Sequence, residues 1–397
     1  MKIALDLRRM ANPGIGRYMR CLTEALLAVA PEHEYLLILP PGEAGILGAV
    51  GATVETIAPE LKYYSIREQI EIPRILRRHR VDLLHSPHFN LPLVCPCTRV
   101  VTIHDVIYLA CAGDLTNPLG RYYYKAMMCA AVRVADRIVT DSNFSRDQIR
   151  RFLRMESEIE VIYPAVDSHW QPVTDTVRLH AVQARYGITS DYILYAGIFK
   201  PRKNHAGLLR AFRRFLDLGG DAMLVLAGPT DGSEKRLRKL AQDLKITDRI
   251  IFTGFVDDSD LVALYSGARV YACPSLYEGF GFTVLEAMAC GVPVVSSAES
   301  SLPEVCGAAA LYADARDALQ FGDALYRAST DSELRRILVE KGYANVRRFD
   351  WRTTALQTLT VYQHAVGMPV VPVAYENKVA MCESPTSRKA DGSVWRG

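Results

Sequence analysis

Residues 274–295 read PSLYEGFGFTVLEAMACGVPVV and predict a loop, a short helix and a buried strand in succession. Pro274 ends the β-prone segment that precedes the loop. Gly291 suits the position just after a helix, and Pro293 cannot continue one. A strand, a loop and a helix that lead into another buried strand are typical of α/β domains.

The loop before this helix has residues that suit a ligand site. Gly279 and Gly281 flank Phe280, so the backbone there can approach a ligand closely. The helix N-terminus just beyond directs free N–H groups at the same place, which favours an anion. Glu278 and Glu286 stand eight residues apart and can contact opposite ends of an elongated ligand. Because glycine-rich turns and helical glutamates are common, this spacing alone leaves a structural role equally open.

Composition indicates two domains and excludes several classes of protein. The 397 residues exceed one ordinary core, and Lys plus Arg number 47 against 44 for Asp plus Glu, so bulk charge does not favour a nucleic-acid partner. Of nine cysteines only Cys95 and Cys97 form a close pair, and we expect reduced thiols in a cytosolic protein. We expect no signal peptide and no membrane span, so that any membrane contact is peripheral.

The N-terminal segment predicts a strand over residues 3–6, a turn containing Gly14 and Gly16, and a helix over residues 18–29. This arrangement can bind phosphate. The dinucleotide fingerprint requires a third glycine where Met19 stands, so a plain turn remains as good an interpretation.

His104 and Asp105 follow the predicted strand 99–103, at the sheet edge where ligands bind in parallel α/β domains. The pair can be a buried ionic contact or part of a catalytic site. A metal site made from His85, His88 and His104 is disfavoured, because no carboxylate or thiol joins them at ligand spacing.

Two basic segments have both a solvated and a functional interpretation. Lys203 stands just before a helix that begins near Asn204, at a strand edge where an anion can bind. The cluster within residues 74–80 predicts a solvated helix face, with contact to acidic lipid headgroups as the alternative.

The segment 274–295, the His104-Asp105 pair and residues 201–204 together resemble the retaining glycosyltransferases of glycosyltransferase family 4, in its mannosyltransferase-like branch. The resemblance covers about residues 1–366. It implies an α/β protein of the GT-B fold, with two Rossmann-like domains whose parallel sheets face a central cleft. The implied divisions are an acceptor domain over 1–170, a nucleotide-sugar donor domain over 171–350, a helix crossing back to the first domain over 351–366, and a flexible tail over 367–397.

The resemblance also implies roles for individual residues. Glu278 contacts hydroxyls of the donor sugar, Lys203 stabilises the departing diphosphate, and His104 lies against the donor sugar; these three are the implied catalytic residues. Glu286 binds the ribose. The other implied donor contacts are Gly14, Gly16, Arg202, Val256, Gly279, Phe280, Gly281, Phe282, Thr283 and Val284.

The sequence departs from the family at Ile198, where an arginine often follows the strand glycine. This leaves the second cationic contact to the diphosphate open, with Arg202 or Lys200 as alternatives.

The implied activity is retaining transfer of a hexose from a nucleoside diphosphate sugar to a glycan or lipid-linked acceptor. Likeness of residues 85–92 and 201–204 to bacterial mannosyltransferases of cell-surface polysaccharide assembly favours GDP-mannose. We assign no metal-ligand cluster to the role of an Asp-x-Asp motif, so we expect no metal cofactor. The expected location is cytoplasmic, with the inner face of the cell membrane as an alternative. A UDP-sugar donor, a nucleotide-sugar 2-epimerase of the same fold and a non-catalytic nucleotide-sugar-binding protein remain alternatives.

Overall fold

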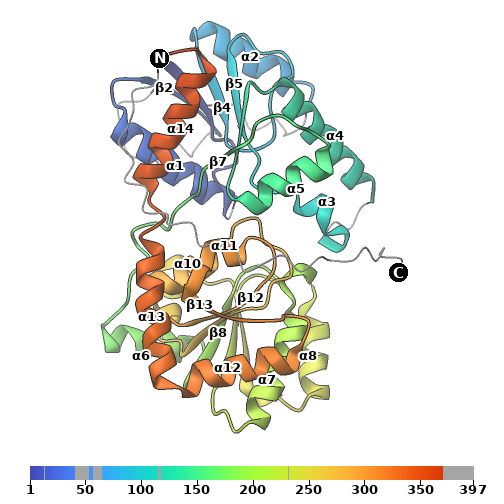
Figure 1. Ribbon diagram of the computed structural model, residues 1–397, viewed down its shortest axis with the longest axis vertical. Helices are drawn as coiled ribbons and strands as arrows, with labels where there is room; N and C mark the ends of the chain where they lie inside the picture. The colour runs from blue at the N-terminus through green and yellow to red at the C-terminus, as the bar shows by residue number, and fades with distance from the viewer. Residues whose placement is uncertain (13, 41–52, 57–64, 115–117, 231, 370–397) are drawn as a thin grey trace.

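The computed structural model describes residues 1–12, 14–40, 53–56, 65–114, 118–230 and 232–369. Within them the chain forms two all-parallel sheets, stacked one domain above the other with helices on both faces of each (Figure 1). The predicted pair of Rossmann-like domains is therefore confirmed. The tail predicted for 367–397 lies outside the described residues from 370 onward.

The first domain contains a seven-stranded sheet of order β3-β2-β1-β4-β5-β6-β7. Its strands are β1 (Lys2–Asp6), β2 (Glu34–Leu39), β3 (Thr53–Thr56), β4 (Leu83–Ser86), β5 (Thr98–Thr102), β6 (Arg137–Thr140) and β7 (Glu160–Val161). Its helices are α1 (Ile15–Val29), α2 (Glu68–Arg78), α3 (Ile107–Ala110), the 3-10 turn η2 (Ala112–Asp114), α4 (Pro118–Val134) and α5 (Asn143–Leu153).

The second domain contains a six-stranded sheet of order β10-β9-β8-β11-β12-β13. Its strands are β8 (Tyr192–Ala196), β9 (Met223–Ala227), β10 (Ile250–Gly254), β11 (Val270–Cys273), β12 (Val294–Ser297) and β13 (Ala310–Ala313). Its helices and 3-10 turns are α6 (Thr176–Arg185), η3 (Pro201–Lys203), α7 (His205–Asp217), α8 (Glu234–Asp243), η4 (Thr247–Arg249), α9 (Asp258–Ser266), α10 (Phe282–Ala289), α11 (Leu302–Cys306), η5 (Gly307–Ala309), α12 (Ala318–Thr330) and α13 (Ser332–Val346).

Each sheet is covered on both faces, which explains why its strands are continuously apolar. Side chains alternate across a strand, so Ile3 and Leu5 of β1 join one apolar cluster while Ala4 joins the cluster on the opposite face. In β8, Ile193 and Tyr195 pack on one face of the second sheet, and the alternate residues Tyr192, Leu194 and Ala196 pack on the other. The helices therefore bury both faces, and only the strand ends remain for polar groups.

Helix α14 (Trp351–Ala365) leaves the second domain and packs against α1 of the first (Figure 1). Its Tyr362 is fully buried, and the Tyr362 hydroxyl lies 2.6 Å from Nδ1 of His85 on β4. The other ring nitrogen of His85 lies 2.8 Å from the Thr102 hydroxyl. Burial lowers the pKa of His85 to about 3, so its neutral ring donates through one nitrogen and accepts through the other. The helix is thus tied to the first sheet by a satisfied polar contact.

Helix α1 begins at Ile15, three residues earlier than the predicted start at residue 18, so Gly16 lies within the helix and not in the turn. A Cβ at Gly16 would stand 1.8 Å from the carbonyl oxygen of Met10, so only glycine fits against the preceding loop. Gly14, at φ 78°, is the residue that makes the turn itself. Close packing explains the second glycine without a ligand.

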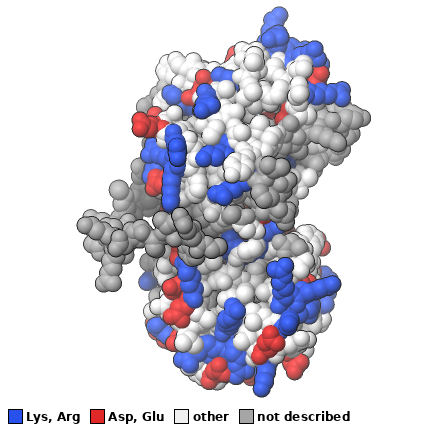
Figure 2. Space-filling view, turned by 90° about the vertical axis from the view of Figure 1, so that its right-hand side faces the viewer, with Lys and Arg blue, Asp and Glu red and all other residues white. Residues whose placement is uncertain are grey.

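Charge is distributed over both domains. Figure 2 shows Lys and Arg side chains on each domain of the face in view, with Asp and Glu between them. Among the described residues, no helix is both long enough and apolar enough to cross a membrane.

Candidate active site

The loop between β11 and α10 is held by hydroxyl groups from the segment that follows β12. Ser301 Oγ donates to the carbonyl oxygens of Glu278, at 3.0 Å, and Phe280, at 2.7 Å. Ser300 Oγ accepts a hydrogen bond of 2.9 Å from the backbone N–H of Glu278. Gly281 has φ 112°, which places the chain at the start of α10. The predicted ligand loop is therefore rigidly supported by its own domain.

The same loop contacts the first domain at Gly279. The hydroxyls of Ser142 and Ser145, at the N-terminus of α5, donate to the carbonyl oxygen of Gly279 at 2.7 and 2.9 Å. A Cβ at Gly279 would stand 2.8 Å from Cβ of Asp105. Glycine is required because the two domains approach each other at this backbone position.

Glu278 is buried and lies beside two cations. Lys203 Nζ is 2.5 Å from one carboxylate oxygen, and Arg202 Nη1 is 3.6 Å from the other. Although burial opposes ionisation, Lys203 and Arg202 together lower the pKa of Glu278. Arg202 also forms an ion pair with Asp114 of the first domain, with Nε 2.7 Å from Oδ2. Three residues predicted for the donor site thus form one charged cluster at the cleft.

Glu286, inside α10, is paired across the domain interface with Arg17 of α1. A guanidinium nitrogen of Arg17 hydrogen-bonds one carboxylate oxygen, and the Tyr265 hydroxyl donates to the other at 3.1 Å. Arg17 also lies 3.3 Å from Asp258 and 5.1 Å above the ring of Trp170. Burial raises the pKa of Glu286 while Arg17 opposes that rise. Glu286, the residue predicted to bind the ribose, is therefore already paired with a cation from the other domain.

His104 lies at the carboxyl end of β5 with both ring nitrogens bonded. Nδ1 is 2.7 Å from a carboxylate oxygen of Asp141, and Nε2 is 3.0 Å from the carbonyl oxygen of Pro87. Two acceptors favour an imidazolium ring, and although burial opposes the charge, Asp141 raises the pKa of His104. The alternative of an ionic pair between His104 and Asp105 is wrong. His104 pairs with Asp141, and Asp105 accepts a hydrogen bond of 2.9 Å from the Ile107 N–H.

Comparison with known proteins shows the family to which the chain belongs. Residues 13–170 match the family described as Glycosyltransferase Family 4, and residues 183–345 match the family described as Glycosyl transferases group 1. The O-antigen chain mannosyltransferase B of Escherichia coli is 33% identical over 290 residues, which make up 72% of this chain and 76% of that protein. The chain belongs to glycosyltransferase family 4.

Other similar proteins extend the comparison. The D-inositol 3-phosphate glycosyltransferase of Saccharomonospora viridis is 31% identical over 304 residues, covering 72% of this chain and 68% of that one. The serotype-specific mannosyltransferase WbdA of Escherichia coli is 30% identical over 68% of this chain, which spans only 34% of that longer protein. Sucrose-phosphate synthase from Thermosynechococcus elongatus has a TM-score of 0.76 at 22% identity, covering 92% of this chain and 99% of that structure, and shows the same GT-B fold.

In this glycosyltransferase the remaining residues predicted to contact the donor lie in different environments. The ring of Phe280 is buried and packs 5.2 Å from Phe282 and 5.6 Å from Phe349, centroid to centroid, so its side chain belongs to the core. Val256 is buried two residues before Asp258, whose carboxylate pairs with Arg17. Thr283 and Val284 lie in the first turn of α10, Val284 fully buried.

Three residues that pair with the predicted site residues were not predicted from the sequence. Arg17 directly follows the glycine turn, and a cation in the first turn of a helix at a cleft is a signal that could have been used. Asp141 directly follows β6, and His104 follows β5, so these adjacent parallel strands place the two residues at one edge of the sheet. Asp114 has no comparable sequence signal. Ile198, where family members often carry arginine, is 39% exposed, and Arg202 is a second cation beside Glu278 after Lys203.

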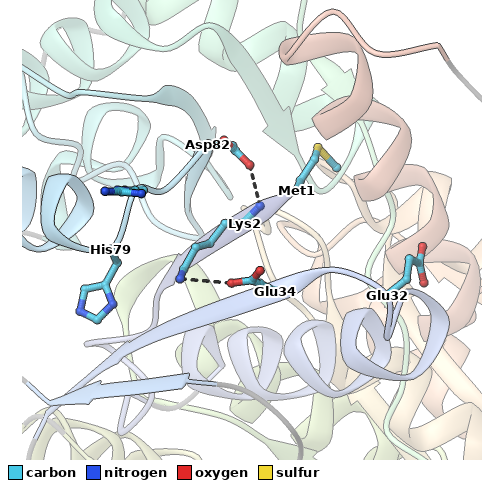
Figure 3. A pocket seen from close by; sticks show the side chains of 7 residues that line it. Met1, Lys2, Glu32, Glu34, His79 and Asp82 are labelled. Carbon is cyan, nitrogen blue, oxygen red and sulfur yellow. Dashed lines mark hydrogen bonds and ion pairs between the residues drawn. The ribbon is translucent and has the colours of Figure 1, made fainter.

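The described residues contain no cluster of three or more His, Cys, Asp or Glu side chains placed to hold a metal ion. A separate cavity lies at the opposite, amino-terminal edge of the first sheet (Figure 3). In it Lys2 pairs with Glu34 at 3.2 Å, and the Lys2 N–H donates to Asp82 at 2.7 Å. Ligands of parallel α/β sheets bind at the carboxyl ends of strands, so this cavity is not the donor site.

Asp141→Asn is expected to lower the pKa of His104, because it removes the main negative charge beside the ring. A group whose folded pKa is raised stabilises the fold below its unfolded pKa, about 6.5 for histidine, and that contribution is lost as pH rises through the folded pKa. The variant should therefore lose stability mainly at low pH. Titration of the His104 ring by NMR checks the shift, with exposed Asp147→Asn as control. An unchanged His104 pKa would contradict the pairing.

Arg17→Ala is expected to destabilise the protein by on the order of 3 kcal/mol at neutral pH, because Glu286 is left buried without its cation. The folded pKa of Glu286, already raised by burial, should rise further, so the deficit should shrink below about pH 4.3 and grow as pH increases. Urea unfolding at several pH values measures it. Arg17→Lys should lose less, and Arg20→Ala, which removes a more exposed pair with Asp167, serves as control. A pH-independent deficit would contradict this account.

Proposed function

We propose that this glycosyltransferase moves mannose from GDP-mannose to a glycan or lipid-linked acceptor, with retained anomeric configuration, in the assembly of a bacterial cell-surface polysaccharide. The names of two similar proteins, O-antigen chain mannosyltransferase B and the mannosyltransferase WbdA, support mannose and a polysaccharide product. The solved structure of HepE from Anabaena with UDP and glucose is 17% identical and bears on the fold alone, so a UDP-sugar stays the alternative donor.

The observation that supports the donor site is the contact of Lys203 and Arg202 with Glu278 at the N-terminus of α10. These cations and the free N–H groups of α10 lie where a diphosphate would meet both. Because Lys203 occupies one oxygen of Glu278 and keeps it ionised, the carboxylate can accept hydrogen bonds from sugar hydroxyls. Glu286 then binds the ribose once Arg17 has moved away from it.

In the proposed reaction, the bond between the anomeric carbon and the leaving phosphate oxygen breaks. The acceptor oxygen bonds to the same face of that carbon, and its proton passes to the leaving phosphate oxygen. Lys203 and Arg202 stabilise the negative charge that develops on the diphosphate. His104 is held by Asp141 at the carboxyl edge of the first sheet, and its ring lies against the donor sugar in the proposed complex. We propose that Lys203 and Arg202, and no resident metal ion, meet the diphosphate charge.

We further propose that the first domain binds the acceptor and touches the cytoplasmic face of the membrane through α2. Ile66 is 83% exposed and Ile70 46% exposed, beside the exposed arginines at positions 67, 74 and 77. Apolar side chains flanked by cations suit an anionic lipid surface. The eight cysteines among the described residues are free thiols, which supports a cytoplasmic location. Failure to sediment with vesicles of anionic phospholipid would contradict the membrane contact.

The donor is tested by thermal shift with GDP, UDP, ADP and dTDP, where GDP should raise the melting temperature most. NMR of the product formed from GDP-mannose should then show the α anomer of the donor retained, with turnover unaffected by EDTA. Stabilisation by UDP alone would establish the alternative donor. An altered free nucleotide sugar without any acceptor would indicate an epimerase, and nucleotide binding without release would indicate a binding protein.

Lys203→Ala should lower kcat by about 100-fold or more, because the charge on the leaving diphosphate is greatest in the transition state. The dissociation constant for the donor should change much less. Nucleotide release and calorimetry measure the two quantities. Lys239→Ala, which removes an exposed lysine of α8, is the matched control. Turnover within about twofold of the unmodified protein would place the diphosphate elsewhere.

A further inference from the structure

Cys95 and Cys97 lie on either side of Pro96, in the segment that joins β4 to β5. Their sulfur atoms are 3.5 Å apart. The pair stands at the amino end of β5, whose five residues span roughly 16 Å at the usual rise per residue, and His104 follows the opposite, carboxyl end of that strand. The two thiols are therefore outside the donor site.

The local chain conformation explains why the sulfurs meet. Residues i and i+2 of a strand point to the same face but stand far apart, whereas here the chain bends at Pro96 and Cys97 before β5 begins. The segment is anchored on both sides. Arg99 Nη1 donates to the carbonyl oxygen of Leu93 at 3.3 Å, and the Leu93 N–H donates to Gln69 Oε1 at 2.8 Å.

The chemistry of the two sulfurs differs. Hydrogen bonding between the thiols lowers the pKa of Cys95 to about 7, with burial opposing the shift and Arg99 assisting it, while the same contact raises the pKa of Cys97. Both side chains are only half-buried, so a small reagent can reach them. At neutral pH the attacking thiolate of Cys95 is available beside a second thiol that can resolve a mixed disulfide.

The remaining described cysteines have different environments. Cys21, Cys273, Cys290 and Cys306 are buried. Cys111 is half-buried, and burial raises its pKa to about 11, so it is a poor nucleophile at neutral pH. Among the described thiols, the contact between Cys95 and Cys97 is the one direct approach of two sulfurs.

We propose that Cys95 and Cys97 form a redox-active dithiol that low-molecular-weight disulfides, such as oxidised glutathione, convert into an internal disulfide. The Cys95 thiolate attacks one sulfur of the oxidant, which releases one thiol and leaves a mixed disulfide on Cys95. Cys97 then loses its proton to solvent and attacks the Cys95 sulfur, which releases the second thiol. Two protein thiols lose two electrons and the oxidant gains them. The sulfurs need to approach by about 1.5 Å to reach bonding distance.

The test uses the full-length protein equilibrated with oxidised glutathione at pH 7, followed by alkylation with N-ethylmaleimide, trypsin digestion and mass spectrometry. The tryptic peptide 81–99 contains both cysteines and no other. We expect it to escape alkylation and to be two hydrogen atoms lighter, and to be alkylated twice after treatment with dithiothreitol. In Cys97→Ser, the glutathione adduct should remain on Cys95, since the resolving thiol is missing.

Cys129→Ser is the matched control, because it removes a half-buried thiol of the same domain and should leave the internal disulfide unchanged. Three outcomes would overturn the proposal. They are double alkylation of peptide 81–99 under oxidising conditions, a glutathione adduct that persists on Cys95 in the protein without substitutions, and a disulfide-linked dimer on a non-reducing gel. Failure of the proposed sugar transfer would not affect this result, because no group of the donor site takes part.

Discussion

Burial of the Glu278 and Glu286 carboxylates is the constraint on which the site depends, because a buried carboxylate is costly unless a cation or hydrogen-bond donors lie beside it. Glu278 finds Lys203 within its own domain, whereas Glu286 finds Arg17 on the other. The two glutamates therefore have different consequences. Glu278 orients a cation within the second domain, and Glu286 joins the two domains.

Another contact across the domain interface also pairs a carboxylate of the second domain with hydrogen-bond donors of the first. Glu304 of α11 accepts from the N–H groups of Asn143 and Phe144, at 2.8 and 3.2 Å, and so satisfies the free N-terminal groups of α5 in the other domain. The Tyr163 hydroxyl, on the segment leaving the first domain, donates to the same carboxylate at 2.6 Å. These contacts lie close to the carbonyl of Gly279, so separation of the domains must break them together with the contacts of the ligand loop.

The two edges of the first sheet serve different chemistry. At the carboxyl edge, His104 pairs with Asp141, and Asp105 lies against Gly279 of the second domain. At the amino edge, the charges of Lys2 and its neighbours are paired and the dithiol lies half-exposed beside β5. The covered faces leave only these edges for polar groups, which explains why both kinds of site are found there.

The sequence by itself determined the alternation of strands and helices, the family and the stretch 274–295, because hydrophobic periodicity, glycines and prolines act over a few residues. Only the tertiary structure decided which charges meet. Arg17 and Glu286 are 269 residues apart, and His104 pairs with Asp141 and not with its neighbour Asp105. Such pairs depend on which strands are adjacent and how two domains pack, and neither is encoded in local spacing. Gly16 reads as part of a phosphate turn, but the conformation of the preceding loop requires glycine there, because it brings the carbonyl of Met10 against the helix.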